Sequence, residues 1–128
     1  MKIVGSDKAP AAVGPYSQGI EVNGLLFLSG MLPINPDNGE IEVTDVKNQT
    51  KQVLDNIVAL LGSQGLSLND VVKATIFLQS MDDFTDVNNV YATYFNEHKP
   101  ARSCVAVKEI PKKALVEIEV IARTVGGA

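Results

Sequence analysis

The chain has 128 residues, 45% of them hydrophobic and 20% charged, which is enough apolar material for one core of ordinary domain size. We therefore expect residues 1–128 to fold as a single domain. The 11 Lys and Arg and the 15 Asp and Glu residues give a net charge of −4, so the chain lacks the positive surplus that binding to nucleic acid or to an anionic membrane surface requires.

Three short strands are predicted in the first third of the chain. Lys2-Ile3-Val4 is the first, and a loop rich in proline and glycine follows it. Glu21-Val22 and Leu25-Leu26-Phe27-Leu28 flank Asn23-Gly24, a dipeptide typical of tight hairpin turns because both residues tolerate positive φ. The turn-forming residues from Pro33 to Gly39 predict a surface loop.

A helix and then a strand are predicted in the middle of the chain. Apolar or small residues recur at helical spacing over residues 45–64, with Thr44 or Asp45 as the N-cap and glycines at the end. Residues 71–78 are β-branched and nearly all apolar, which is typical of a strand that helices cover on at least one face.

A second helix and two strands are predicted in the last third. Asp82-Asp83 place negative charge at the start of the helix, and His98, as a C-terminal cap, and Pro100 end it. The segments 103–107 and 116–122 are the final strands. The helix carries one apolar stripe, formed by Phe84, Val87, Tyr91, Tyr94 and Phe95.

In this order the elements predict an α+β fold in which two helices cover one face of a largely antiparallel sheet. No third helix is available to cover the other face. If that face is partly apolar it needs another copy of the chain, and a closed symmetric oligomer is the common solution.

Ionisable side chains gather on the two final strands. Because side chains alternate along a strand, Arg102 and Cys104 point to one side of theirs, and Glu117 and Glu119 share one side of the other. Two carboxylates so close repel each other unless each finds a partner, and Arg102 is a candidate from a nearby strand. On this pattern alone, solvated charges on an outward sheet face are the simpler interpretation.

Three blocks of sequence carry a resemblance to a known family. One block runs from Pro100 to Val107, continues with Ile110-Pro111 and ends with the segment from Val116 to Ala122. The others are Ala9 to Gln18 and Leu28 to Pro33. Together they resemble the signatures of the RidA/YjgF family of reactive-intermediate deaminases, and the likeness spans the whole chain.

The resemblance implies a chorismate-mutase-like α+β fold and a homotrimer with three sites in the clefts between subunits. It also implies an enzyme, a 2-iminobutanoate/2-iminopropanoate deaminase, which hydrolyses 2-imino acids and their enamines, such as 2-aminoacrylate, to 2-keto acids and ammonia. Such hydrolysis needs no metal or cofactor. The sequence agrees, since it has no closely spaced His/Asp/Glu cluster and no phosphate-binding glycine motif.

The resemblance gives the catalytic roles to Arg102 and Glu117. Arg102 would grip the substrate carboxylate, because a planar guanidinium offers two parallel charge-assisted hydrogen bonds where lysine offers a point charge. Glu117 would deprotonate the attacking water or shuttle protons to the departing nitrogen, in a cleft that raises its pKa. Glu119 is expected to be structural.

Four further positions are implied in substrate binding. Tyr16 would pack its ring over the substrate from the adjoining subunit, Cys104 would contribute chiefly its backbone N–H, and the Gly30 carbonyl and Asn88 would orient the substrate. No histidine at a plausible distance in sequence would activate Cys104 as a nucleophile. Met31 stands where many relatives carry glutamine, and we expect it to widen the tolerance for apolar substrate side chains.

Other functions stay open on the sequence. A non-catalytic regulatory protein would use the same cleft and Arg102 to sense a carboxylate metabolite, although sensing an anion gains nothing from Glu117 nearby. Ribonuclease activity has been attached to relatives, but the net charge of −4 and the lack of a basic stripe argue against it.

The single cysteine, Cys104, excludes a disulfide within the chain. The first residues do not form a charged-then-apolar leader, and apolar runs such as 57–61 are far below the roughly 20 residues that a membrane-spanning helix needs. We expect a cytoplasmic protein with no membrane span.

Overall fold

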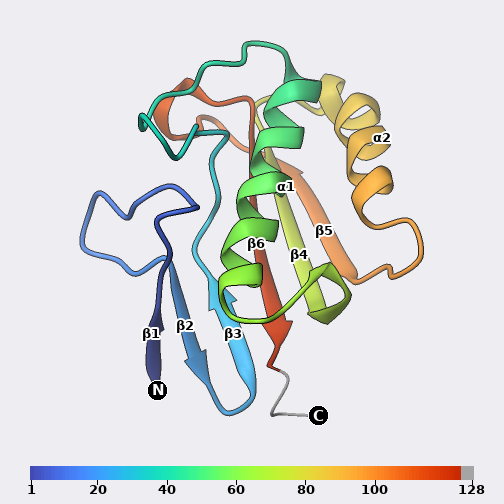
Figure 1. The fold of residues 1–128 in the computed structure, drawn as a ribbon. Coiled ribbons are helices and arrows are strands. Elements are labelled where there is room, and N and C mark those ends of the chain that lie inside the picture. Colours follow the sequence, from blue (N-terminus) through green and yellow to red (C-terminus); the bar gives the residue numbers. More distant parts are fainter. Residues whose placement is uncertain (125–128) are drawn as a thin grey trace.

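Figure 1 shows one sheet with two helices packed on the same face. The computed structural model describes residues 1–124. The predicted α+β class and the order of elements are confirmed. In chain order the elements are β1 (Lys2–Val4), β2 (Gly19–Val22), β3 (Leu25–Leu28), α1 (Val46–Ser63), β4 (Val71–Leu78), α2 (Phe84–Tyr94), β5 (Ala101–Ala106) and β6 (Val116–Arg123).

The six strands lie in the order β1-β2-β3-β6-β4-β5. Neighbouring strands are antiparallel, except that β4 and β5 are parallel. A parallel pair needs a crossover connection, and α2 supplies it. The strand of Arg102 is therefore an edge strand, and only β4 separates it from the strand of Glu117, so the two strands are near each other, as expected, without pairing directly.

The hairpin between β2 and β3 turns at Asn23 and Gly24, as predicted. Both residues have positive φ, 51° and 80°, as a two-residue turn that matches the twist of the strands requires. The turn sets the register that places Ile20 opposite Phe27.

Helix α1 begins after Asp45, which resolves the choice between two N-caps. The Asp45 carboxylate accepts hydrogen bonds from the backbone N–H and the side chain of Asn48, and these bonds lower the pKa of Asp45. The helix ends at Ser63, and Gly65 follows with a φ of +73°.

Two buried amides of α1 hold the connections around it. The Asn56 amide donates to the carbonyl oxygens of Leu32 and Ile34, at 3.1 and 2.9 Å. Gln49 accepts from the backbone N–H of Leu115. The predicted surface loop is thus only partly at the surface, because Pro33 and Ile34 at its start are buried.

Helix α2 buries Val87, Tyr91 and, just after its end, Phe95, as the apolar stripe predicts. His98 does not cap this helix, which ends at Tyr94. Instead the His98 Nε2 atom lies 2.6 Å from the carbonyl oxygen of Val71 and ties the connection after α2 to the start of β4.

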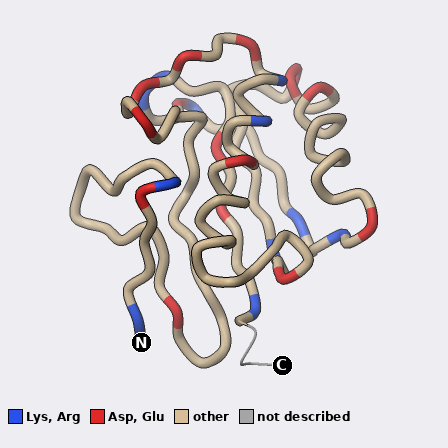
Figure 2. Tube along the Cα trace, viewed as in Figure 1, with Lys and Arg blue, Asp and Glu red and all other residues tan. Residues whose placement is uncertain are grey.

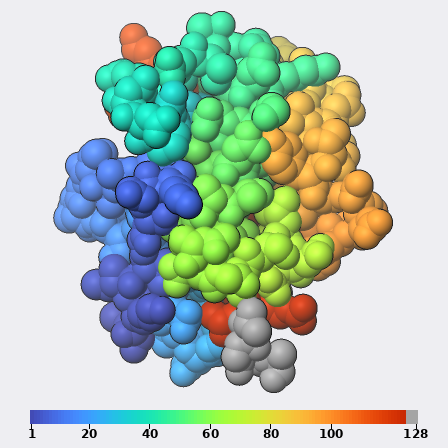
Figure 3. All heavy atoms as spheres, viewed as in Figure 1, coloured from blue at the N-terminus to red at the C-terminus, as the bar shows by residue number. Residues whose placement is uncertain are grey.

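The core lies between the helices and one face of the sheet, where Leu26, Ile57 and Ile118 are almost completely buried. Figure 3 views the molecule from the helix side, where side chains cover most of the sheet. Among residues 1–124, no helix is long and apolar enough to cross a membrane.

Within residues 1–124, no helix or strand covers the face of the sheet away from the helices, and this face is partly apolar. The pairing places Ile3, Ile20, Phe27 and Ile121 side by side across four strands. Ile3, Phe27 and, near the other edge, Val105 are exposed. We call this the open face.

Candidate functional site

Arg102 lies on the helix side of β5, beneath α2. It pairs with Ala74 of β4, whose side chain is buried against the helices. The Arg102 Nη1 atom donates a 2.7 Å hydrogen bond to Oδ1 of Asn88. The guanidinium carbon is 5.0 Å from the ring centre of Tyr91 and 5.8 Å from that of Phe84. The side chain is exposed to solvent, and its contacts on the protein side are with α2.

Cys104 follows on the same side of β5, two residues after Arg102, and pairs with Ile76. Its side chain is half-buried. Burial raises the pKa of the Cys104 thiol, although the nearby positive charge of Arg102 acts in the opposite direction. A protonated thiol is a poor nucleophile, and the geometry therefore favours the non-nucleophilic role expected of Cys104.

Glu117 lies on the open face, opposite Phe77 of β4. Its carboxylate fits against the backbone of Gly30, where a side chain at position 30 would collide with it. Burial, and then the negative charge of Glu119, raise the pKa of Glu117. The result is a half-buried carboxyl group that holds a proton more readily than one in water.

Tyr16 lies in the loop between β1 and β2 and is 52% exposed. This loop is held by Gln18, whose amide accepts from the backbone N–H of Ser6 at 2.7 Å and donates to the carbonyl oxygen of Pro10 at 2.6 Å. The Ser29 hydroxyl donates to the carbonyl oxygen of Ser17 at 2.6 Å. The Ser29 bond thereby ties the residue after Tyr16 to the residue before Gly30.

The six predicted site residues thus form two groups of three on different parts of the chain. Direct contacts join Arg102 to Asn88 and bring Gly30 against Glu117. Within one copy, Arg102 and Glu117 lie on opposite faces of the sheet. One group consists of Arg102, Asn88 and Cys104 on the helix side, and the other of Tyr16, Gly30 and Glu117 on the side of the open face and the N-terminal loop.

Sequence reasoning missed three side chains that shape these groups. The sequence predicts Tyr91 and Phe84 only as part of the apolar stripe of α2, and their spacing from Asn88 is the signal that places all three on one helix face. Gln18 stood in a resemblance block without a role, and only the fold shows that it closes the Tyr16 loop.

The expected effect of Met31 on the substrate pocket is not supported. Met31 forms a bridge with Ile118, and both side chains belong to the core on the helix side. Glu117, next to Ile118, points the other way. Met31 therefore acts on the packing of the core.

Two surface hollows, of about 510 and 520 Å³, include neither Arg102 nor Glu117. One lies between α1 and α2, and the other is bordered by the Tyr16 loop. In the described part of the chain, no three His, Cys, Asp or Glu side chains are placed to hold a metal ion.

Comparisons with known proteins identify the family of the chain. The family profile described as "Endoribonuclease L-PSP" matches residues 6–124. The 2-iminobutanoate/2-iminopropanoate deaminase of Escherichia coli is 44% identical over 124 residues, which cover 94% of this chain and 96% of that protein. A Lactococcus lactis protein named as a candidate regulator, AldR, is 48% identical and covers 95% and 97% of the two chains.

A solved structure of E. coli TdcF with bound serine matches with a TM-score of 0.91 and 41% identity, and covers 96% of this chain and 98% of that one. The residues that the family profile matches include both groups of site residues, from Tyr16 to Glu117. The chain therefore belongs to the RidA/YjgF family, whose profile carries the endoribonuclease description.

Proposed function

We propose that the chain hydrolyses 2-imino acids, and the enamines in equilibrium with them, to 2-keto acids and ammonia. The observation that carries the proposal is the half-buried Glu117 carboxyl with its raised pKa, because a site that only binds an anion has no use for an acid beside it. The name of the E. coli relative, a 2-iminobutanoate/2-iminopropanoate deaminase, supports the same reaction.

Arg102 binds the substrate carboxylate in this proposal. Asn88 occupies one donor of Nη1, so the other guanidinium donors are free for two parallel hydrogen bonds to a carboxylate. The serine bound in the E. coli TdcF structure is itself a 2-amino acid, which is consistent with a family site that accepts a carboxylate next to a nitrogen-bearing carbon.

Glu117 moves the protons. As a carboxylate it takes a proton from a water molecule whose oxygen forms a bond to the carbon of the protonated imine, and the electron pair of the C=N double bond moves onto the nitrogen. The Glu117 carboxylic acid then gives that proton to the resulting amine. The C–N bond breaks and ammonia leaves with its electron pair, while Glu117 takes the proton from the hydroxyl oxygen as C=O forms and passes it to the ammonia. One positioned acid–base group of this kind accelerates a reaction by about 10²–10⁴-fold.

The two groups of residues meet only if two copies of the chain combine, because one copy holds Arg102 and Glu117 on opposite faces. We propose that the edge strand β5 of one copy approaches the open face of the next, in the closed homotrimer that the resemblance implies. Exposed apolar side chains on the open face, Ile3, Phe27 and Val105, support such an interface.

The test generates 2-aminoacrylate from serine with a dehydratase and follows the release of pyruvate and ammonia. We expect Arg102→Ala and Glu117→Gln each to lose activity by about 100-fold or more. Wild type no faster than buffer would refute the enzyme proposal.

A mixing experiment tests the assembly. When Arg102→Ala and Glu117→Gln chains are unfolded and refolded together, about one quarter of the sites should be intact, since each site takes one half from each neighbour. The control mixes Arg102→Ala chains with the Arg102→Ala/Glu117→Gln double variant. This mixture contains no Arg102, so none of its sites is intact. Recovery no greater than in this control would refute a site between copies.

A second candidate is a regulatory protein that binds a carboxylate metabolite without turnover, and the regulator name of the L. lactis relative favours it. It predicts that pyruvate binds to wild type and to Glu117→Gln equally, while neither hydrolyses the imine. A ribonuclease is not proposed, because the net charge is −4 and basic positions lie scattered among acidic ones in Figure 2.

A further inference from the structure

One face of α2 packs against the Arg102 guanidinium. Phe84, Asn88 and Tyr91 are four and three residues apart, so they follow one another along the same side of the helix. Asn88 contacts the edge of the guanidinium through its 2.7 Å hydrogen bond. The Tyr91 ring lies closest to it, with 5.0 Å between the ring centre and the guanidinium carbon, and the Phe84 ring centre is 5.8 Å away. Both distances are in the range of cation–π attraction.

Tyr91 is held rigidly in this place. It is only 6% exposed and stacks on Phe95, with 4.6 Å between ring centres. Its buried hydroxyl has no hydrogen-bond partner among the described residues. The contact between Tyr91 and Arg102 is therefore made by the ring of Tyr91 and not by its hydroxyl.

We propose that Tyr91 is a positioning residue for Arg102, and that its ring, with Asn88 at the edge, fixes the guanidinium in the orientation that binds a substrate carboxylate. The inference rests on the proposed function for the identity of that carboxylate. An arginine that is already oriented loses less side-chain entropy when its ligand binds.

The expected signature is a change in KM with little change in kcat. The carboxylate does not react, so Arg102 holds it equally in the substrate and in the transition state, and weaker holding raises KM alone. We expect Tyr91→Met, which keeps an apolar side chain in the core, to raise KM for the imine by about tenfold. Tyr91→Phe keeps the ring and should restore a KM close to that of wild type.

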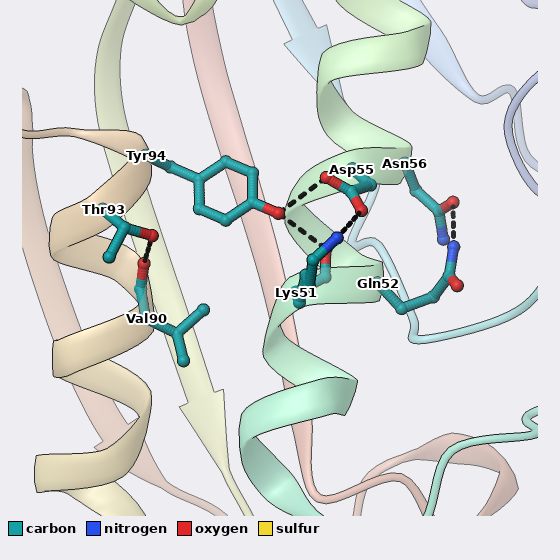
Figure 4. Close-up of polar contacts among 7 residues, drawn as sticks. All are labelled: Lys51, Gln52, Asp55, Asn56, Val90, Thr93 and Tyr94. Atoms are coloured by element: carbon teal, nitrogen blue, oxygen red, sulfur yellow. Dashed lines mark hydrogen bonds and ion pairs between the residues drawn. The ribbon is translucent and has the colours of Figure 1, made fainter.

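Tyr94 provides a matched control on the same helix. Its hydroxyl donates to Asp55 of α1 at 2.6 Å, and Figure 4 shows it directed toward Asp55 and Lys51 on that helix. Tyr94→Leu removes a ring and a hydrogen bond from α2 without touching Arg102. If it raises KM as much as Tyr91→Met does, the effect comes from a general loosening of α2, and the inference is wrong.

A second measurement needs no activity. The Arg102 side-chain N–H signal, assigned by its absence in Arg102→Lys, should be shifted upfield by the aromatic rings. It should move toward the free-arginine position in Tyr91→Met, stay shifted in Tyr91→Phe and Tyr94→Leu, and move by a smaller amount in Phe84→Leu. An unshifted signal in wild type, or one that ignores Tyr91→Met, overturns the inference.

The two measurements separate the inference from the deaminase proposal. If wild type hydrolyses no imine but the Arg102 signal responds to Tyr91→Met as expected, the proposed function fails and the positioning role of Tyr91 stands. If the imine is hydrolysed with unchanged KM in folded Tyr91→Met, the proposed function stands and the positioning role fails. Thermal unfolding shows which variants are folded, and Phe84→Leu gives the same KM test with less risk to the core, because Phe84 is only partly buried.

Discussion

The two faces of the sheet differ in how complete they are within one copy of the chain. On the helix side, α1 and α2 bury the inward residues of the central strands almost entirely, as Ile76 and Ile118 show. On the open face, Phe27 is 40% exposed. The helix side therefore supplies the stability of the fold. The open face contributes little to folding, which leaves it available for a partner and for Glu117.

Placing an aspartate on each side of the sheet should test the difference between the two faces most directly. Phe27→Asp places a charge on the open face, and we expect it to prevent association of copies and to lower activity by about 100-fold or more. Val58→Asp is the matched control, because Val58 is 42% exposed on α1 and lies on the helix side of the sheet, away from the open face. Sedimentation velocity measures the association of both variants, and the imine assay measures their activity. Association of Phe27→Asp at wild-type strength would mean that copies do not meet through the open face.

Two glycine-to-alanine substitutions, one beside Glu117 and one on α1, compare the two sides of the sheet by the effect of one added methyl group. Gly30→Ala adds a methyl group that collides with the Glu117 carboxylate, and displacing this acid–base group should lower kcat by about 10–100-fold. Gly62→Ala adds the same group to α1, where nothing lies within 4 Å, and should raise the free energy of unfolding by about 0.5–1 kcal/mol. Steady-state kinetics and chemical denaturation measure both. An unchanged kcat in Gly30→Ala would show that the position of Glu117 does not matter.

The smallest expected effect is a pH dependence of stability that comes from Glu117. Burial raises the pKa of this group in the folded chain, so the folded chain binds the proton more tightly than the unfolded chain. Its stabilising contribution is complete below the ordinary pKa of glutamate and is lost as the pH rises through the raised value. Relative to Glu117→Gln, wild type should therefore lose thermal stability as the pH rises above the ordinary pKa of glutamate. If the Tm values of wild type and Glu117→Gln change equally with pH, the half-buried environment assigned to Glu117 is contradicted.

Much of the fold follows from local sequence signals. The Asn23-Gly24 turn is specified by two residues that accept positive φ. Alternation along β5 and β6 correctly separates Arg102 and Cys104 from their neighbours, and Glu117 from Ile118. These features depend on one element at a time, which is why the sequence predicts them.

The remainder depends on how elements combine. Whether β5 pairs with β6 or with β4 is decided by the crossover through α2. The residues of β5 alone do not indicate which strand it pairs with. The bond from Arg102 to Asn88 exists only once that crossover is made. The buried amides Gln49 and Asn56 likewise look like solvated helix residues until the loop and the chain around Leu115 pack against them.

The connection from the end of α2 to the start of β5, residues 95–100, has a consequence for how this chain tolerates insertions and deletions. It is short, and His98 anchors it to Val71. Removing one residue would slide β5 by one position, and a slip of one position exchanges the two sides of a strand. Ser103 would then lie beneath Asn88 and the arginine would point to the opposite side. The number of residues in this segment thus determines on which side of the sheet the arginine lies.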